Sequence, residues 1–254
     1  SVLSYNYEKS IVTQSFSKSH SMTGYRIGYL ISNQKIIEKL AKLQALCLTN
    51  VSEPIQYVSM KSLEDDVTDN VKIMAIRNTP NGDEYDKDVA LGVYYAINNG
   101  AKVINMSFGK GFSDHSNWVK DAIAYAAKYD VLIVAAAGNN GENNDFVKNY
   151  PNDQDGIGEE VSDNFISVGA STSDYSSDLI AGFSNYGKSS VDVFAPGTRI
   201  YSSYPNNKYE FAQGTSMAAP LVSGIAALLF SQYPKLSASE VKKIIMVSGL
   251  PIKK

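Results

Sequence analysis

The stretch VLIVAAAGNNG, residues 131–141, decides the fold that we expect for this chain. Its first seven residues are apolar without interruption, which is typical of a β-strand that is covered on both faces. The glycine- and asparagine-rich turn that follows marks the end of that strand. Strands of this kind occur in parallel sheets that carry helices on both sides. The stretch therefore predicts an α/β protein with polar residues at the carboxyl end of a central strand.

Strands and helices alternate along the chain on both sides of this stretch. Apolar runs predict further strands, and apolar residues at helical spacing predict helices between them. The expected strands are residues 71–77, 102–108, 165–171 and 191–196, and the expected helices are residues 88–98, 118–129, 216–232 and about 237–248. This alternation predicts a doubly wound parallel sheet, in which ligands bind beyond the carboxyl ends of the strands.

The first 66 residues have a different pattern. We expect a short strand at residues 10–17, a helix at residues 33–47, and a second helix from Ser52 to about Leu63. The acidic and polar stretch LEDDVTDN, residues 63–70, then separates this segment from the alternating region. The sequence therefore predicts two parts, residues 1–66 and residues 67–254, with a seam near residues 64–72.

The composition is that of a globular protein and narrows the possible functions. The 254 residues are 44% hydrophobic and 19% charged, and the net charge is −3. No basic block is present, so nucleic-acid binding is not expected. The longest apolar run, residues 221–230, is too short to span a bilayer and predicts a buried helix. Cys47 is the single cysteine, which excludes an internal disulfide. The chain opens at Ser1 without a basic and apolar leader, so we expect a mature fragment or a partial reading frame, and no compartment is predicted.

Three polar motifs follow predicted strands or precede a predicted helix. They are Ser107-Phe108-Gly109, the turn at residues 138–141, and Gly214-Thr215-Ser216. Each has a structural interpretation as well, because glycine and asparagine suit turns and serine commonly caps a helix. Their shared place at one edge of the sheet favours a functional site.

Together these motifs resemble the subtilisin-like serine proteases. The stretches that match are VINMSFGKG, VLIVAAAGNNG, FSNYGKSSVDVFAPG and GTSMAAPLVSGIAALL, at residues 103–111, 131–141, 183–197 and 214–229. The resemblance implies that Ser216 is the nucleophile and that the Asn139 side chain stabilises the oxyanion. It also implies that Ser107, Phe108 and Gly109 form the edge that pairs with the substrate backbone, and that the substrate is a peptide or protein.

The base and the carboxylate that such a serine needs are not found in this sequence. In the family, the histidine lies in an H-G-T motif and the aspartate in a D-T-G or D-S-G turn, and neither motif occurs in the 254 residues. The two histidines are His20 and His115, and the DQDG stretch at residues 153–156 follows no predicted strand. Because a serine hydroxyl is a poor nucleophile without its base, we expect an inactive or incomplete catalytic centre.

The first part of the chain resembles a different family. SFSKSHSMTGYRIGY, residues 15–29, is similar to the cofactor-lysine segment of class I/II aminotransferases of fold type I. The resemblance implies that Lys18 forms the Schiff base with pyridoxal phosphate and that Ser15 and Arg26 hold the cofactor phosphate. Other residues that this family needs lie outside the similar segment, so cofactor binding is not expected to be complete.

Three hypotheses remain open from the sequence. The chain is a subtilisin-like serine endopeptidase with incomplete catalytic machinery, a fragment of an aminotransferase, or a non-catalytic chimera. We favour the first for family membership and the third for activity. The expected fold is an incomplete doubly wound parallel sheet of the subtilisin-like α/β class, preceded by a short α/β aminotransferase-like segment. No metal site is expected, and the peptidase part needs no cofactor.

Overall fold

The computed structural model describes residues 71–79, 82–154, 160–173, 179–206 and 208–250, together with the backbone of two strands near the amino terminus. These two strands, β1 (Val12–Ser15) and β2 (Gly28–Ile31), pair antiparallel. The chain divides into two compact units, residues 1–70 and residues 71–254. The predicted strand at residues 10–17 thus contains β1, whereas the helices predicted at residues 33–47 and 52–63 lie outside the described residues.

Four parallel strands form the sheet of the second unit. They are β3 (Val103–Met106), β4 (Leu132–Ala136), β5 (Phe165–Ser171) and β6 (Val193–Pro196), and they lie side by side in chain order. All five residues of β4 are buried, as its continuous apolar sequence predicts. The parallel α/β fold expected from the sequence is confirmed.

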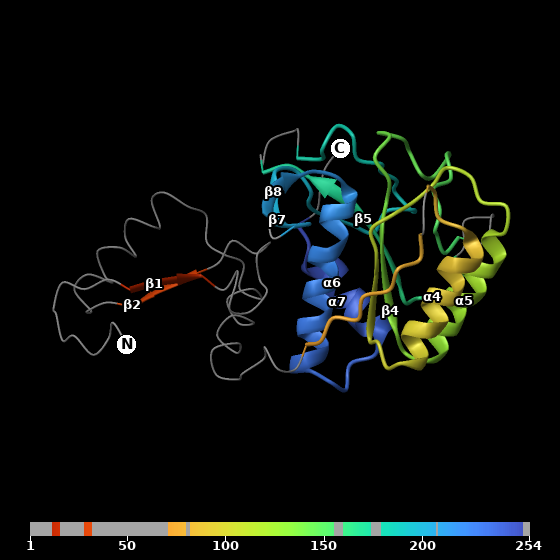
Figure 1. Cartoon of the computed structure of the whole chain (residues 1–254), viewed down its shortest axis with the longest axis horizontal. Coiled ribbons are helices and arrows are strands. Elements are labelled where there is room, and N and C mark those ends of the chain that lie inside the picture. The colour runs from red at the N-terminus through yellow and green to blue at the C-terminus, as the bar shows by residue number, and fades with distance from the viewer. Residues whose placement is uncertain are drawn as a thin grey trace. The chain divides into compact units, whose positions relative to one another are not determined.

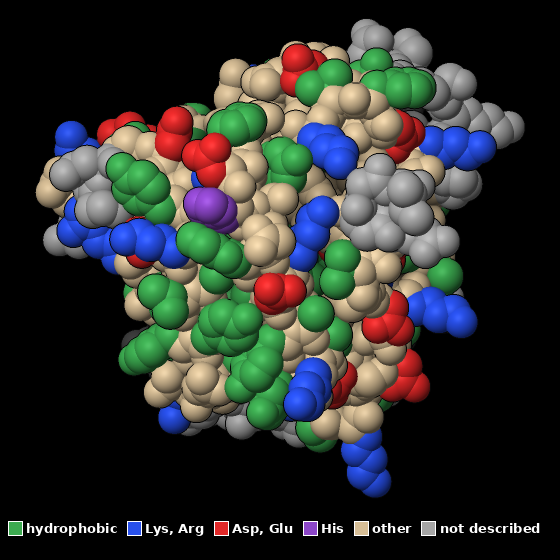
Figure 2. Space-filling view, turned by 90° about the vertical axis from the view of Figure 1, so that its right-hand side faces the viewer, with side chains coloured by type: hydrophobic (Ala, Val, Ile, Leu, Met, Phe, Trp, Pro, Cys, Tyr) green, Lys and Arg blue, Asp and Glu red, His purple; other side chains and the backbone are tan. Residues whose placement is uncertain are grey.

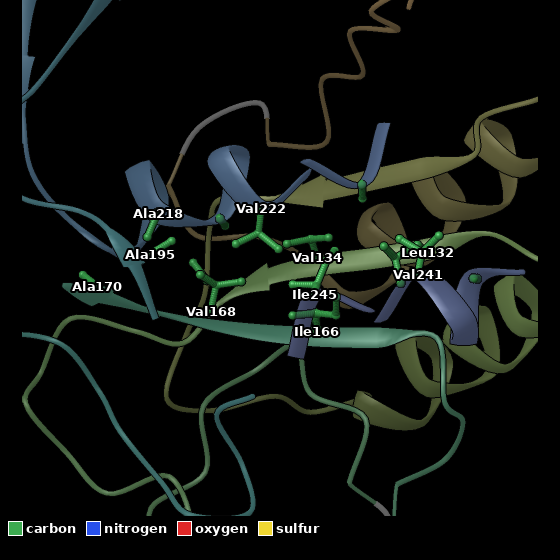
Figure 3. Packing of buried hydrophobic residues seen from close by; sticks show 14 of the residues in the cluster. Leu132, Val134, Ile166, Val168, Ala170, Ala195, Ala218, Val222, Val241 and Ile245 are labelled. Carbon is green, nitrogen blue, oxygen red and sulfur yellow. The ribbon is translucent and has the colours of Figure 1, made fainter. Parts of the chain in front are cut away.

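Helices cover both faces of this sheet (Figure 1). On one face, α4 (Asp86–Asn98) and α5 (Ser116–Lys128) pack against alternate residues of β4, Ile133 and Ala135. On the other face, α6 (Thr215–Gln232) and α7 (Ala238–Ser248) pack against Leu132, Val134 and Ala136 of β4. Figure 3 shows this second core, with Leu132, Val134, Ile166, Val168, Val222, Val241 and Ile245. The alternation of β4 between two cores explains why its strand carries no polar side chain.

Helix α6 is the most apolar element and lies against all four strands. By length and composition alone it could cross a membrane. Its buried residues nevertheless pack in the core beside the sheet, where the alanines Ala218, Ala219 and Ala226 are completely buried. Small side chains let a helix approach a sheet closely, so the apolar character of α6 is explained by core packing, as expected for residues 221–230.

One predicted strand is wrong. The segment VKIMAIR, residues 71–77, has no strand geometry, and its Ile73 side chain is 93% exposed. A strand requires a hydrogen-bonded neighbour, and in the described part of the chain β3 pairs with β4 alone and nothing pairs with residues 71–77. Residues 71–77 have the apolar pattern of a strand, but no described strand lies beside them to form the hydrogen bonds.

A hairpin that the sequence reasoning missed precedes α6. Strands β7 (Ile200–Tyr204) and β8 (Lys208–Ala212) pair antiparallel, and nearly all of their residues are exposed. Strand β7, IYSSY, has no regular alternation of apolar and polar residues. Strand β8, KYEFA, alternates over only four residues and buries no face, so the hairpin gives a weak strand signal. Its second strand leads directly into the turn that carries Ser216.

Candidate active site

Ser216 is presented at the amino terminus of α6. Gly214 precedes the helix with a φ of 142°, a backbone angle that strongly favours glycine. The Gly214 N–H donates to the carbonyl oxygen of Gly197 at 2.8 Å, which ties this turn to the end of β6. Ser216 is then the second residue of the helix and is half-buried. Its backbone N–H lies in the first turn, where helical N–H groups have no partner within the helix.

Asn139 is oriented by the residue before Ser216. Its side-chain oxygen accepts from the Thr215 backbone N–H at 2.8 Å and from Thr215 Oγ1 at 3.0 Å. Both contacts occupy the oxygen, so the NH₂ group of Asn139 is left to donate. Asn139 Nδ2 and the Ser216 N lie close together at the start of α6, because a Cβ built on Gly214 would lie 3.6 Å from the first and 3.7 Å from the second.

The turn that carries Asn139 is held in place by two buried asparagines that the sequence reasoning missed. Asn185 Oδ1 accepts from the N–H groups of Asn140 at 2.9 Å and Glu142 at 3.1 Å. Asn185 Nδ2 donates to Asn144 Oδ1 at 3.0 Å, and Asn144 Nδ2 donates to the carbonyl of Ala137 at 2.9 Å. Asn185 lies in a stretch that resembles the proteases, but its role depends on contacts that no local pattern reveals.

Ser107 contacts the backbone of Ser216. Pro220, inside α6, has no N–H to donate to the carbonyl of Ser216 four residues earlier. The Ser107 hydroxyl donates to that carbonyl instead, at 2.9 Å. Asn105 Nδ2 donates in turn to Ser107 Oγ at 2.8 Å. The structure thus brings together Ser107, Asn139 and Ser216, which lie far apart in the sequence.

The segment after β3 is fixed by a buried carboxylate. Asp86, at the start of α4, accepts from Ser113 Oγ at 2.8 Å and from the His115 backbone N–H at 3.0 Å, and it lies 2.9 Å from the ammonium of Lys110. Burial alone would raise the pKa of Asp86, but the hydrogen bonds from Lys110, His115 and Ser113 outweigh this effect and lower it. The Lys110 backbone also pairs with Tyr150 in both directions at 2.9 Å.

Phe108 and Gly109 lie between Ser107, which contacts the Ser216 carbonyl, and Lys110, which pairs with Tyr150. Phe108 is half-buried and lines a small cavity together with Val89, Val119 and Tyr150. A Cβ on Gly109 would lie 3.0 Å from Asn149 Nδ2, and a Cβ on Gly138 would lie 3.2 Å from Asn149 Cγ. The Asn149 side chain therefore lies between the segments that end β3 and β4, which the sequence reasoning did not foresee.

The other candidate residues are not brought to Ser216 by a contact in the described structure. The His115 ring stacks on Trp118 with 4.1 Å between centroids. Asp153, from the DQDG stretch, belongs to a separate buried cluster with Lys242. His20, Lys18 and Arg26 lie outside the described residues, and of Ser15 only the backbone, at the end of β1, is described. Within the described ranges, no three acidic, histidine or cysteine side chains are placed to hold a metal ion.

Comparison with known proteins identifies the family. Residues 55–249, about three quarters of the chain, match the family model Peptidase_S8, described as the subtilase family. The chain belongs to the subtilase family. This match includes residues 55–66, which the sequence reasoning placed in the amino-terminal part, and it begins after the aminotransferase-like stretch at residues 15–29.

Individual subtilases resemble the chain over the same part. Subtilisin DY of Bacillus licheniformis is 40% identical over 179 residues, which are 69% of this chain and 60% of that protein. Thermitase of Thermoactinomyces vulgaris is 43% identical over 157 residues, which are 62% of this chain and 50% of that protein. The crystal structure of a cold-adapted subtilisin-like serine proteinase superposes with a TM-score of 0.59 at 31% identity, covering 71% of this chain and 61% of that one. The chain thus spans about 60% or less of the length of these relatives.

Proposed function

We propose that this subtilase chain carries the nucleophile and the oxyanion-binding groups of a serine endopeptidase that acts on peptides or proteins. The observation that carries the proposal is the pairing of Asn139 with Thr215, which turns the Asn139 NH₂ group away from Thr215 and leaves it free to donate. An attacking Ser216 hydroxyl would place negative charge on the substrate carbonyl oxygen, and the Asn139 NH₂ and Ser216 N–H would stabilise that charge.

The proposed chemistry is limited by the missing base. Ser216 Oγ must lose a proton as it attacks the carbonyl carbon, and the leaving amine must gain one. Neither the histidine motif nor the aspartate motif of the family occurs in the 254 residues. We therefore infer that this chain by itself does not turn over peptide bonds, although its oxyanion site is assembled.

The substrate backbone would pair with residues 107–109. Their position is fixed on one side by the hydrogen bond from Ser107 to the Ser216 carbonyl and on the other by the pairing of Lys110 with Tyr150.

A cysteine at the nucleophile position tests the proposal without a base. A thiol is nucleophilic as its thiolate near pH 8 and reacts with activated esters unaided. We expect the Ser216→Cys variant, with Cys47→Ser to remove the natural thiol, to be acylated by a peptide thioester much faster than a Ser202→Cys control, whose serine is exposed on β7. Loss of such an asparagine costs about 10²–10³ in turnover in a subtilisin, so adding Asn139→Ala should slow acylation about 10²-fold.

The rate of acylation, measured by intact mass spectrometry, decides the outcome. Equal rates for the Ser216→Cys and Ser202→Cys proteins would show that Ser216 does not occupy an acyl-transfer site. A fast Ser216→Cys protein that is unaffected by Asn139→Ala would retain the nucleophile but refute the oxyanion role of Asn139.

The aminotransferase-like stretch supports a second, narrower proposal. Strand β1 ends at Ser15, shortly before Lys18 in the sequence, and β2 begins at Gly28, shortly after Arg26. We propose that pyridoxal phosphate forms weak adducts with this chain that are not selective for Lys18. No transamination follows, because the other residues with which aminotransferases hold the cofactor lie outside the similar segment. Borohydride reduction and peptide mapping test this proposal, and stoichiometric modification confined to Lys18 would contradict it.

A further inference from the structure

Four charged residues gather on the α7 side of the sheet, apart from Ser216. The ammonium of Lys242, on α7, lies 2.8 Å from Glu160 and 3.6 Å from Asp192, which precedes β6. Asp153 interacts with the same three charges. Lys242, Asp153 and Asp192 are largely buried, whereas the Glu160 side chain is 40% exposed. Three carboxylates therefore share one ammonium in a mostly buried cluster.

The carboxylates of this cluster are not equally satisfied. Asp192 Oδ2 accepts from the Ser167 N–H at 2.7 Å, and its other oxygen faces Lys242. Glu160 accepts from Lys242 and reaches solvent. Asp153 is 8% exposed, and its Oδ2 atom is buried without a hydrogen-bond partner. An ionised Asp153 would be costly, because its buried Oδ2 atom has no donor and the Lys242 ammonium is shared with two other carboxylates.

The unbalanced charge requires a positive partner. With all groups ionised, three negative charges face one positive charge, so the cluster needs a cation or a proton. In the part of the chain that the structure describes, no three acidic, histidine or cysteine side chains are arranged to hold a metal ion. We propose that Asp153, Glu160, Asp192 and Lys242 form a buried proton-binding site, in which the proton resides on Asp153 and stabilises the bridge between Gln154 and Glu160 beside Lys242.

The electrostatic surroundings of Asp153 support this assignment. Burial raises the pKa of Asp153 to about 7, and the charges of Glu160 and Asp192 add to the increase, whereas Lys242 opposes it. Burial also raises the pKa of Asp192, although that carboxylate has a backbone donor and the ammonium beside it. Asp153, with an oxygen that lacks a donor, is the group that best accommodates the proton.

The site lies beside the backbone bridge between Gln154 and Glu160. The Val161 N–H donates to the Asp153 carbonyl at 2.6 Å, and Gln154 and Glu160 form an antiparallel bridge. Gln154 Nε2 also donates to Ser190 Oγ at 2.8 Å. When Asp153 loses its proton, it becomes a third negative charge beside Glu160 and Asp192. The resulting repulsion acts between Asp153 and Glu160 and weakens the bridge between Gln154 and Glu160.

The raised pKa of Asp153 determines how the stability of the folded chain should change with pH. Because the pKa of Asp153 is raised in the folded state, the native protein holds a proton that the unfolded chain releases above about pH 4. Stability from this site is complete below that pH and is lost as the pH rises through about 7. We expect the folding constant of the full chain, from urea unfolding, to fall by up to about tenfold per pH unit between pH 5 and 7 through this site.

The Asp153→Asn variant should remove that contribution. Because other groups also contribute to the pH dependence of folding, the quantity to compare is the difference in slope between the wild type and the variant. An Asp163→Asn variant, which changes an exposed carboxylate in the same region, should keep the wild-type slope. Identical slopes in the wild type and the Asp153→Asn protein would overturn the proposal.

Direct titration provides a second measurement in the native wild-type chain. The side-chain carboxyl ¹³C resonance of Asp153 should titrate with a midpoint near 7, and Glu160→Gln should lower the midpoint because it removes a neighbouring negative charge. A wild-type midpoint below 5 would show that Asp153 is ionised in the cluster and would likewise overturn the proposal.

Discussion

Two glycines and one proline set the backbone around Ser216. Gly138 has a φ of 109° at the turn that leads to Asn139, and Gly214 has a φ of 142° before α6. Pro220 leaves the Ser216 carbonyl free for the Ser107 hydroxyl. Each residue solves a local backbone problem, and together they place the Asn139 amide beside the Ser216 hydroxyl.

Gly138 should tolerate no side chain. A Cβ at this position would collide with the Asn185 amide, and its positive φ is strained for any other residue. We expect Gly138→Ala to lower the free energy of unfolding by about 2 kcal/mol or more. Gly182→Ala is the control, because a Cβ there meets nothing within 4 Å, and it should change stability by less than about 1 kcal/mol. Urea unfolding of the two variants measures the difference, and equal effects would contradict the geometry described for Gly138.

Only part of the site could be predicted from residues in sequence. Ser216 and Asn139 could be proposed as site residues because one begins a predicted apolar helix and the other follows a predicted strand, and both lie in motifs that resemble the family. Asn185, Asn149 and Asp86 could not, because each acts on residues distant in sequence and leaves no periodic pattern. Polar side chains that hold loops in place can be identified only from the folded structure, because their hydrogen-bond partners are distant in sequence.

At the level of elements, two turns on the strand ends are joined by Asp145. Its carboxylate accepts from the N–H groups of Lys188 at 2.7 Å, Ser189 at 3.1 Å and Ser190 at 3.0 Å. The Ser190 hydroxyl donates to it as well, at 2.8 Å. Burial alone would raise the pKa of Asp145, but these hydrogen bonds outweigh it and lower the pKa. The turn after Asn139 is thereby anchored to the turn that precedes β6.

Stability should depend on Asp145 in the opposite pH direction from Asp153. A carboxylate with a lowered pKa contributes stability above its unfolded pKa, near 4, and loses that contribution as the pH falls through its folded pKa. We expect Asp145→Asn to be less stable than the wild type at pH 7 and the two proteins to converge as the pH falls below the lowered pKa of Asp145. Thermal unfolding from pH 2 to 8 tests this, with Asp163→Asn as the exposed control. A constant difference at every pH would show that the charge of Asp145 is not what matters.

Elements with a buried face could be predicted, and elements without one could not. Strands β3 to β6 and helices α4 to α7 each bury an apolar face, and that face produces the periodicity from which they were predicted. The exposed hairpin β7–β8 has no such face and was missed. Residues 71–77 have the apolar pattern of a strand, yet they lack a partner in the described chain, so pattern alone gave the wrong answer there.

The subtilase match, residues 55–249, covers nearly all of the second compact unit and the last residues of the first. The described cores are built from residues after Tyr85, on the two faces of one sheet. Figure 2 faces the side of the molecule on which α4 and α5 lie, and hydrophobic side chains gather on its surface. The exposed large hydrophobic side chains of these two helices are Leu91 and Tyr95 of α4 and Trp118 of α5. Exposed apolar surface of this kind favours association, so we expect the purified chain to aggregate readily.

Deletion of the first 66 residues tests whether the two parts fold together. Because the described cores lie wholly in the second unit, we expect the urea midpoint of the truncated chain to match that of the full chain. Circular dichroism at equal protein concentration measures both transitions. Loss of a single cooperative transition on deletion would show that the two parts share one core.

The central claim is that Ser216 occupies an assembled oxyanion site but has no base in this chain, and a fluorophosphonate probe tests it most directly. This probe reacts with a serine that a neighbouring base has activated. We predict that the full chain is labelled no faster than its Ser216→Ala variant, because the histidine and aspartate motifs are absent from the 254 residues. Strong labelling that disappears in the Ser216→Ala variant would show that a base activates Ser216 and would contradict this account.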